Sequence, residues 1–411
     1  MQTSLYEKVF IDGFHKPSYV VATLALDRAP SERELAAAIV TTLELHPRLR
    51  SLTRTMFGVP VALIPQPATE WLHRGGLRVL PVADIHALEE VLLSTPIDLQ
   101  TSMPLEVYLV EEPAVLVVKV HHAVIDATSG FALLRDFSRV VAGRTLVDAP
   151  NATAKPWDRL VDALSGRHGI VDWVTRAQLR PRVPNVSVTA NYNPIGMLEE
   201  EPVTHTERII QGGFPRIAER ASGLEATFSE FVASALLSAM FRYNAAAEGQ
   251  PPEELGLMVA RARPRARQGG VSFSADTRVV SIPAAQLDVP HRALTLRALR
   301  DAGRDNRHND LALAALYAIR KWKGRERMPS EQRAIHFTLS DVTAFGRRVN
   351  PSEGSFGVRD MRVLASPTSF DHAGMLVSRF GDDVRLSLVS HRGAVDANTI
   401  LATTITNLEE S

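Results

Sequence analysis

Stretches of β-branched and apolar residues alternate along the chain with stretches whose apolar positions recur every three or four residues. This pattern predicts a mixture of strands and helices. The strands predicted in the first half cover 19–26, 59–64, 105–110 and 115–120. Those predicted in the second half cover 255–262, 277–282, 334–339, 361–365, 375–380 and 384–390. The four residues 111–114 between two of the strands predict a hairpin loop.

Several helices are announced by side chains that can cap backbone N–H groups. Ser31 with Glu34, and Thr227 with Glu230, have the spacing of a capping box. Asp84 suits the N-cap position of a short helix. The helices predicted from these signals and from periodicity cover 31–46, 84–93, 129–142, 228–246, much of 292–322, and 396–409.

The apolar periodicity weakens between about residues 147 and 194, where Pro181 and Pro184 stand in a short basic run. Prolines and weak periodicity are typical of a connecting segment. We therefore expect an N-terminal lobe over 1–150, a linker over 151–190 and a C-terminal lobe over 191–411.

The stretch 115–130, VLVVKVHHAVIDATSG, is the strongest candidate for chemistry. A β-branched run leads into His121 and His122, and Asp126 follows four positions later. Neighbouring side chains on a strand point to opposite faces, so we expect one histidine to face a substrate and the other to be structural. A neutral histidine is a suitable general base for an alcohol or amine. A structural pair and a metal site remain alternatives, although no other dense cluster of histidine and acidic residues supplies further metal ligands.

Composition narrows the function classes. The 411 residues carry 46 basic and 46 acidic side chains and no cysteine. Balanced charge gives no field that attracts nucleic acid, and no nucleic-acid-binding motif accompanies the basic stretches. Without cysteine there are no disulfides, thiolate–metal sites or thiol nucleophiles. The sequence shows no signal peptide and no run of about 18 apolar residues, so we expect a cytoplasmic protein without a membrane span.

Three segments resemble one enzyme superfamily. HHAVIDA, at 121–127, resembles the HH-x3-DG signature of the CoA-dependent acyltransferases, which include condensation domains, polyketide-associated acyltransferases and alcohol acetyltransferases. VARARPR, at 259–265, resembles their PV-x-LRPR strand, and Leu339-Ser340-Asp341 resembles their S-N segment. The similarity extends over most of the chain. It implies an α/β fold of two chloramphenicol-acetyltransferase-like lobes, a pseudodimer with a tunnel between the lobes.

The resemblance also implies roles for individual residues. His122 would be the general base for acyl transfer from an acyl-CoA or a carrier-protein thioester to a small alcohol or amine, without a covalent acyl-enzyme. No bound cofactor and no metal are implied, because the thioester is a co-substrate. His121 would be structural, and Asp126 would shape the turn through an ion pair with Arg263. The remaining residues expected to line the site are Ala127, Ser340 and Asp341.

Two of these positions depart from the family pattern. Ala127 replaces a glycine, and Asp341 replaces an asparagine and adds negative charge near a developing oxyanion. These departures support one alternative, a non-catalytic homologue that binds a carrier protein. Two others also stay open: condensation between carrier-bound substrates, and hydrolysis if water replaces the acceptor. The alternating arginines from Arg261 to Arg267 and the basic run 320–327 are either solvated surface or docking sites for CoA or a carrier protein.

Overall fold

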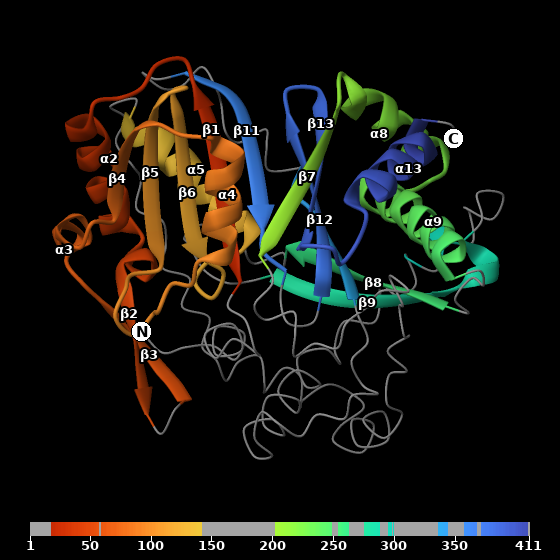
Figure 1. The fold of residues 1–411 in the computed structure, drawn as a ribbon, viewed down its shortest axis with the longest axis horizontal. Coiled ribbons are helices and arrows are strands. Elements are labelled where there is room, and N and C mark those ends of the chain that lie inside the picture. Colours follow the sequence, from red (N-terminus) through yellow and green to blue (C-terminus); the bar gives the residue numbers. More distant parts are fainter. Residues whose placement is uncertain are drawn as a thin grey trace.

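In the computed structural model the chain forms two lobes that lie side by side, each built on one β-sheet (Figure 1). The structure describes residues 18–56, 59–141, 202–248, 254–262, 275–287, 295–297, 299, 336–343, 357–367 and 371–409. The predicted linker 151–190, most of the predicted helix 292–322, Arg263 and the basic run 320–327 lie outside the described residues.

The first sheet has the strand order β11-β1-β6-β5-β4. Its neighbours pair antiparallel except for β4 and β5, which are parallel. Successive residues of β6 alternate between two apolar clusters, one on each face of the sheet. Helices α2, α3 and α5 contribute to the cluster on one face, and α4 to that on the other. The elements are β1 (Tyr19–Leu26), α2 (Glu32–Leu45), β2 (Ser51–Met56), β3 (Val59–Pro65), α3 (Ala68–His73), β4 (Leu77–Val82), α4 (Ile85–Ser94), β5 (Leu105–Glu112), β6 (Val115–His121), α5 (Ala127–Val141) and β11 (Val358–Ala365).

The second sheet has the order β7-β13-β12-β10-β8-β9, and α8, α9 and α13 lie on its outer side (Figure 1). The largest apolar cluster of the described residues fills the space between these helices and the sheet. Among the described residues no single helix is both long and apolar enough to span a membrane; α8 with most of α9 reaches that length and composition only as a pair bent by 91°. The elements are β7 (Val203–Ile210), α8 (Gly213–Gly223), α9 (Phe228–Glu248), β8 (Glu254–Ala262), β9 (Ala275–Pro283), β10 (His336–Asp341), β12 (Asp371–Phe380), β13 (Asp383–His391) and α13 (Ala397–Glu409).

All ten predicted strands are present, with ends that differ by a few residues. The capping boxes are confirmed: the Glu34 backbone N–H donates to the Ser31 hydroxyl, and the Glu230 N–H to that of Thr227. Asp84 caps α4 as predicted. One prediction needs correction, because β5 runs to Glu112 and the hairpin loop has two residues instead of four. The elements that the pattern did not predict are short or amphipathic: β2, α3, β4, β7 and α8.

Strand β11 crosses from the second half of the chain into the first sheet (Figure 1). It pairs antiparallel with β1 over its whole length, with Val20 opposite Ala365 and Leu24 opposite Met361. The predicted division of the chain at residues 150–190 did not anticipate this exchange, and the lobe boundaries stay predictions. The first lobe is therefore completed by a strand that is remote in sequence.

The two sheets repeat one arrangement. In the first, β1 and β6 are antiparallel, β6 and β5 form a hairpin, and β4 lies parallel to β5. In the second, β7 and β13 are antiparallel, β13 and β12 form a hairpin, and β10 lies parallel to β12. In both, a helix follows the last strand of the hairpin, α5 in the first lobe and α13 in the second. The lobes are thus two copies of one plan, as expected for a pseudodimer.

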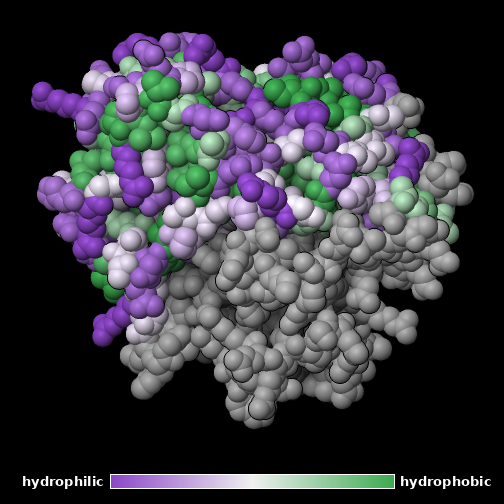
Figure 2. All heavy atoms as spheres, in the orientation of Figure 1, coloured by the Kyte–Doolittle hydropathy of each residue, from purple (hydrophilic) through white to green (hydrophobic). Residues whose placement is uncertain are grey.

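A chain of ion pairs joins the lobes. Arg362 of β11 lies 2.8 Å from Glu89 of α4 and 2.8 Å from Glu207 of β7. Arg385 of β13 lies 2.9 Å from Glu207 and 2.5 Å from Asp360 of β11. The Glu89 side chain is fully buried, so its charge needs these partners. The alternating charges fix the position of β11 against β7 and β13. On the face shown in Figure 2, hydrophilic and hydrophobic residues are interspersed over both lobes.

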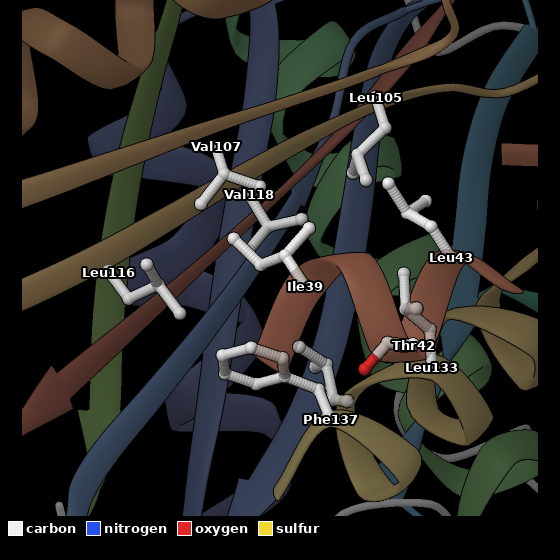
Figure 3. Close-up of a pocket in the computed structure, with 10 residues that line it drawn as sticks. Ile39, Thr42, Leu43, Leu105, Val107, Leu116, Val118, Leu133 and Phe137 are labelled. Carbon is white, nitrogen blue, oxygen red and sulfur yellow. The ribbon is translucent and has the colours of Figure 1, made fainter. Parts of the chain in front are cut away.

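A small apolar cavity lies in the first lobe, between the sheet and helices α2 and α5 (Figure 3). Its volume is about 30 Å³, and none of the predicted site residues lines it. It is too small for an acyl substrate. The side chains that surround it are Ile39, Thr42, Leu43, Leu105, Val107, Leu116, Val118, Leu133, Leu134 and Phe137.

We predict that Arg362→Met destabilises the protein by about 3–5 kcal/mol, because it leaves the buried Glu89 carboxylate without its cation. Arg208→Met is the matched control, since Arg208 is an exposed arginine on neighbouring β7. Urea unfolding would measure both. A loss for Arg362→Met no larger than that for Arg208→Met would show that the network does not hold the lobes together.

Candidate active site

The turn from β6 to α5 is fixed by backbone hydrogen bonds on both sides. All seven residues of β6 are buried. The His121 N–H donates to the Pro104 carbonyl at 2.8 Å, and the His122 N–H donates to the Ser18 carbonyl at 2.8 Å. The strand ends at His121, so His122 is the first residue of the turn. A side chain in this place is held by a rigid scaffold, as a general base requires.

His121 is buried and points into the protein. Its ring meets the edge of the Tyr19 ring at a centroid distance of 5.3 Å, and its Nδ1 accepts a hydrogen bond from the Ala123 N–H at 3.1 Å. Burial, together with the neighbouring charges of His122 and Lys119, lowers the pKa of His121 to about 3. A ring that stays neutral and accepts at Nδ1 carries its proton on Nε2. These contacts suit the structural role predicted for His121.

Lys119, two residues earlier on β6, supports the same face and was not singled out from the sequence. Its side chain is fully buried, and Nζ donates to the Thr95 carbonyl at 2.5 Å. Nζ also lies 4.4 Å from the centre of the Tyr19 ring, a cation–π contact. Burial lowers the pKa of Lys119 to about 8, although the nearby Glu106 carboxylate acts in the opposite direction. The feature of the sequence that could have identified Lys119 is its place as a single lysine inside an otherwise apolar strand.

His122 is only partly buried, in contrast to His121. Burial lowers its pKa below the usual 6.5, while hydrogen bonds to the backbone of His122 and Ile125 and the negative charge of Asp126 partly oppose this shift. The imidazole is therefore neutral near pH 7 and can accept a proton. Among the described residues, neither His122 nor Asp126 belongs to a group of three potential ligands close enough together to bind one metal ion.

Asp126 caps helix α5. Its carboxylate accepts a hydrogen bond from the Ser129 N–H at 2.8 Å, its carbonyl accepts from the Gly130 N–H at 2.8 Å, and the residue is 1% exposed. An aspartate here satisfies an N–H group that the first helical turn leaves without a partner. Asp126 thus shapes the turn through its own helix. The predicted ion pair with Arg263 stays a prediction, because Arg263 lies outside the described residues.

Ala127 is the first residue of α5. A helical backbone is open to alanine at no conformational penalty, so the position does not require the freedom of glycine. The replacement of glycine by Ala127 is therefore compatible with a normal turn and helix start.

Ser340 and Asp341 end strand β10 of the second sheet. The Asp341 carboxylate accepts hydrogen bonds from the Thr343 N–H at 2.9 Å and the Thr343 hydroxyl at 2.7 Å, and from the Ser229 hydroxyl. Three donors thus fix the orientation of the Asp341 carboxylate. The next residue, Val342, belongs to the same apolar cluster as Val124 of the His122 turn. The structure thus brings this end of β10 to the first-lobe core.

The second lobe contains a counterpart of this turn. His391 ends β13 opposite Val203, the first residue of β7, as His121 ends β6 opposite Tyr19, the first residue of β1. The Arg392 N–H donates to the Pro202 carbonyl at 2.9 Å, which repeats the bond from His122 to Ser18. Asp396 caps α13 through the Thr399 N–H at 3.2 Å, as Asp126 caps α5. Arg392, an exposed residue, therefore occupies the position of His122, so the second copy of the turn lacks the candidate base.

Comparisons with known proteins bear on the fold. No family model matches the sequence, and no curated protein matches it. Solved structures do match. The condensation domain of the monacolin K polyketide synthase aligns with a TM-score of 0.67 and 15% identity, over 99% of this chain and 96% of that one. The trichothecene 15-O-acetyltransferase from Fusarium sporotrichioides aligns with a TM-score of 0.69 and 11% identity, over 99% and 94%.

A third match is the polyketide synthase associated protein 5 from Mycobacterium tuberculosis, with a TM-score of 0.66 and 13% identity over 99% and 96% of the two chains. This chain has the fold of the condensation domains and their related acyltransferases. The two-lobed α/β architecture expected from the HHAVIDA segment is thereby confirmed. The tunnel between the lobes stays a prediction.

We predict that His121→Leu destabilises the protein by about 1–3 kcal/mol, because the buried Ala123 N–H loses its acceptor. His121→Asn is the matched variant, since its side-chain oxygen can replace Nδ1, and it should lose less. Urea unfolding at pH 7.5 would compare the three proteins. Equal losses in both variants would show that this hydrogen bond is not what His121 provides.

The pKa of His121 also predicts a dependence of stability on pH. The folded pKa of about 3 lies below the unfolded value of 6.5, so the unfolded state binds more protons between these values. Stability due to neutral His121 is complete above pH 6.5 and is lost as the pH falls toward 3. In His121→Asn the fall between pH 6.5 and 4 should be shallower by up to about 1.4 kcal/mol per pH unit. An unchanged slope would contradict the shift.

Proposed function

We propose that this protein is an acyltransferase that moves an acyl group from a CoA or carrier-protein thioester to a hydroxyl or amine, with His122 as general base. The observation that carries the proposal is the neutral imidazole of His122, a partly buried residue that is held by the turn after a fully buried strand. The fold adds support, because it is shared with structures described as an O-acetyltransferase and a condensation domain.

In the proposed reaction His122 removes the proton of the acceptor O–H or N–H as that atom attacks the thioester carbonyl carbon. The new C–O or C–N bond forms, the C–S bond breaks, and the proton passes from His122 to the departing sulfur, which leaves as a thiol. No acyl-enzyme forms, so the chain needs no nucleophile of its own, in keeping with its lack of cysteine. Asp126 stabilises the transient imidazolium by its charge and positions it by capping α5.

The two departures from the family pattern are compatible with this chemistry. Ala127 takes up a helical conformation, and the Asp341 carboxylate is engaged by Ser229 and Thr343. Both therefore lend little support to a non-catalytic homologue. We also propose a cytoplasmic location, since a chain without cysteine is compatible with a reducing compartment.

A second candidate is condensation between two carrier-bound substrates, which would form an amide or ester. It is favoured by the condensation domains among the structures of the same fold, such as the first condensation domain of the calcium-dependent antibiotic synthetase. A panel of free acyl-CoA and acyl-carrier-protein donors, each offered with free alcohols and amines and with aminoacyl-carrier acceptors, separates the two. Turnover with free acceptors favours the simple acyltransferase; turnover with carrier-bound acceptors alone favours condensation.

We predict that His122→Ala lowers kcat/KM by about 10²–10⁴-fold, the usual contribution of a positioned general base. Arg392→Ala is the matched control, because Arg392 holds the same backbone position in the second lobe. Product formation by mass spectrometry, with circular dichroism to confirm folding, would measure both. Full activity in His122→Ala would refute the mechanism. Binding of a carrier protein by a wild type that turns over no donor would favour the non-catalytic alternative.

The pH profile of kcat/KM provides a second test. Since the pKa of His122 is lowered, activity should be level near pH 7 and fall on an acid limb below pH 6.5. Asp126→Asn keeps a good N-cap but removes the negative charge that raises the pKa of His122. Its acid limb should therefore lie at lower pH than that of the wild type. A limb that moves to higher pH, or stays in place, would show that Asp126 does not act on His122 through charge.

A further inference from the structure

Three side chains from the two lobes meet at a place remote from the HHAVIDA turn in sequence. His86 and Glu90 stand one helical turn apart on α4, and His205 comes from β7 of the second sheet. One ligand atom from each lies within 4.8 Å of the other two. The His86 and His205 rings lie 4.1 Å apart between centroids and are tilted by 45°. His86 is exposed, Glu90 is partly buried and His205 is buried.

An ordinary surface interaction explains only part of this group. His86 and Glu90 could form a helical ion pair, since His86 Nε2 lies 3.6 Å from the Glu90 carboxylate. That pair does not account for His205, which is 4% exposed. Its Nε2 faces the fully buried Glu89 carboxylate at 3.1 Å. That 3.1 Å approach is an ion-pair distance: both ring nitrogens of His205 are buried, and neither has a hydrogen-bond partner among the described residues.

A buried ring nitrogen without a partner is costly and calls for an explanation. The Glu89 carboxylate, 3.1 Å from Nε2, favours the tautomer with its proton on Nε2, which leaves a lone pair on Nδ1 for a metal. A carboxylate that orients a histidine through its second nitrogen is the usual outer partner of a metal-bound histidine. Glu89 is itself held by Arg362 and by Thr23, so it can fix the His205 ring.

We propose that His86, Glu90 and His205 form a site for a zinc-type divalent cation that links α4 of the first lobe to β7 of the second. Two imidazoles and one carboxylate are a common zinc ligand set, with water in the fourth position. Ligand atoms around a tetrahedral zinc lie about 3.3–3.6 Å apart, because each bond is ~2.0–2.2 Å long. The exposed His86 and partly exposed Glu90 side chains can close the remaining gap by rotation. The site is independent of acyl transfer.

Zn²⁺ and Co²⁺ alone are the probes, added to the full-length protein after treatment with a chelator. We expect about one Zn²⁺ per chain by competition with a chromogenic chelator, an intense tetrahedral Co²⁺ spectrum, and a higher melting temperature with Zn²⁺. His86→Ala and Glu90→Gln change only exposed or partly exposed side chains and should keep the fold. Each should weaken Zn²⁺ binding by more than the ~10–100-fold typical of an outer-partner mutation.

His73→Ala is the matched control, because His73 is another exposed helical histidine, 3.9 Å from a glutamate but without a third ligand among the described residues. It should bind Zn²⁺ as the wild type does. Zn²⁺ binding that is absent from the wild type, or equal in wild type and His86→Ala, would overturn the proposal. Acyl transfer measured in the same variants reports separately on the proposed function, since none of these residues lies in the HHAVIDA turn.

Discussion

The position of strand β11 is the constraint on which the rest of the molecule depends. Its side chains Asp360 and Arg362 are bound by Glu207 and Arg385 of the second lobe and by the buried Glu89. Its backbone meanwhile completes the first sheet. Buried ion pairs contribute little net stability, but they penalise every arrangement that leaves a charge without a partner. They therefore specify one placement of the lobes.

That placement reaches the candidate base through a short series of hydrogen bonds. Just beyond β11, Ser366 binds the start of β1: its hydroxyl accepts from the Tyr19 N–H at 2.6 Å, and its carbonyl accepts from the Ser18 hydroxyl at 3.0 Å. The Ser18 carbonyl in turn accepts the His122 N–H. The segment after β11, from the second half of the chain, thus positions Ser18 and Tyr19, and Ser18 in turn binds the backbone of His122. The contact between the lobes therefore helps to set the geometry of the turn that carries His122.

The sequence predicted what is encoded locally. Strand β6 and the caps of α2, α4 and α9 follow from neighbouring residues, and all appear in the structure. Strands β4 and β7 were missed because each mixes polar with apolar residues and contains a proline or several charged side chains. The crossover of β11 could not be predicted, since a strand pattern does not reveal its partner.

Contacts between distant segments escaped prediction for the same reason. The engagement of Asp341 by Ser229 joins residues 112 positions apart, and His205 meets His86 only because β7 packs beside α4. The sequence therefore showed no dense cluster of metal ligands, although folding brings one together. The repeat of the two lobes is equally hard to see in the sequence. The two turns share a strand-ending histidine and, five residues later, a capping aspartate: His121 and Asp126 in the first lobe, and His391 and Asp396 in the second.

The repeat explains why two adjacent histidines differ so much. In both lobes the strand ends on a buried histidine, and the following N–H binds the residue before the partner strand. The strand-ending histidine of each lobe is thus part of the buried scaffold. At the next residue the side chains of the two lobes differ. The first lobe places His122 there and the second places Arg392, an obligate cation that cannot accept a proton at neutral pH. Of two otherwise equivalent turns, only the first therefore carries a side chain that can act as the proposed base, and the second half of the chain supports that turn through strand β11.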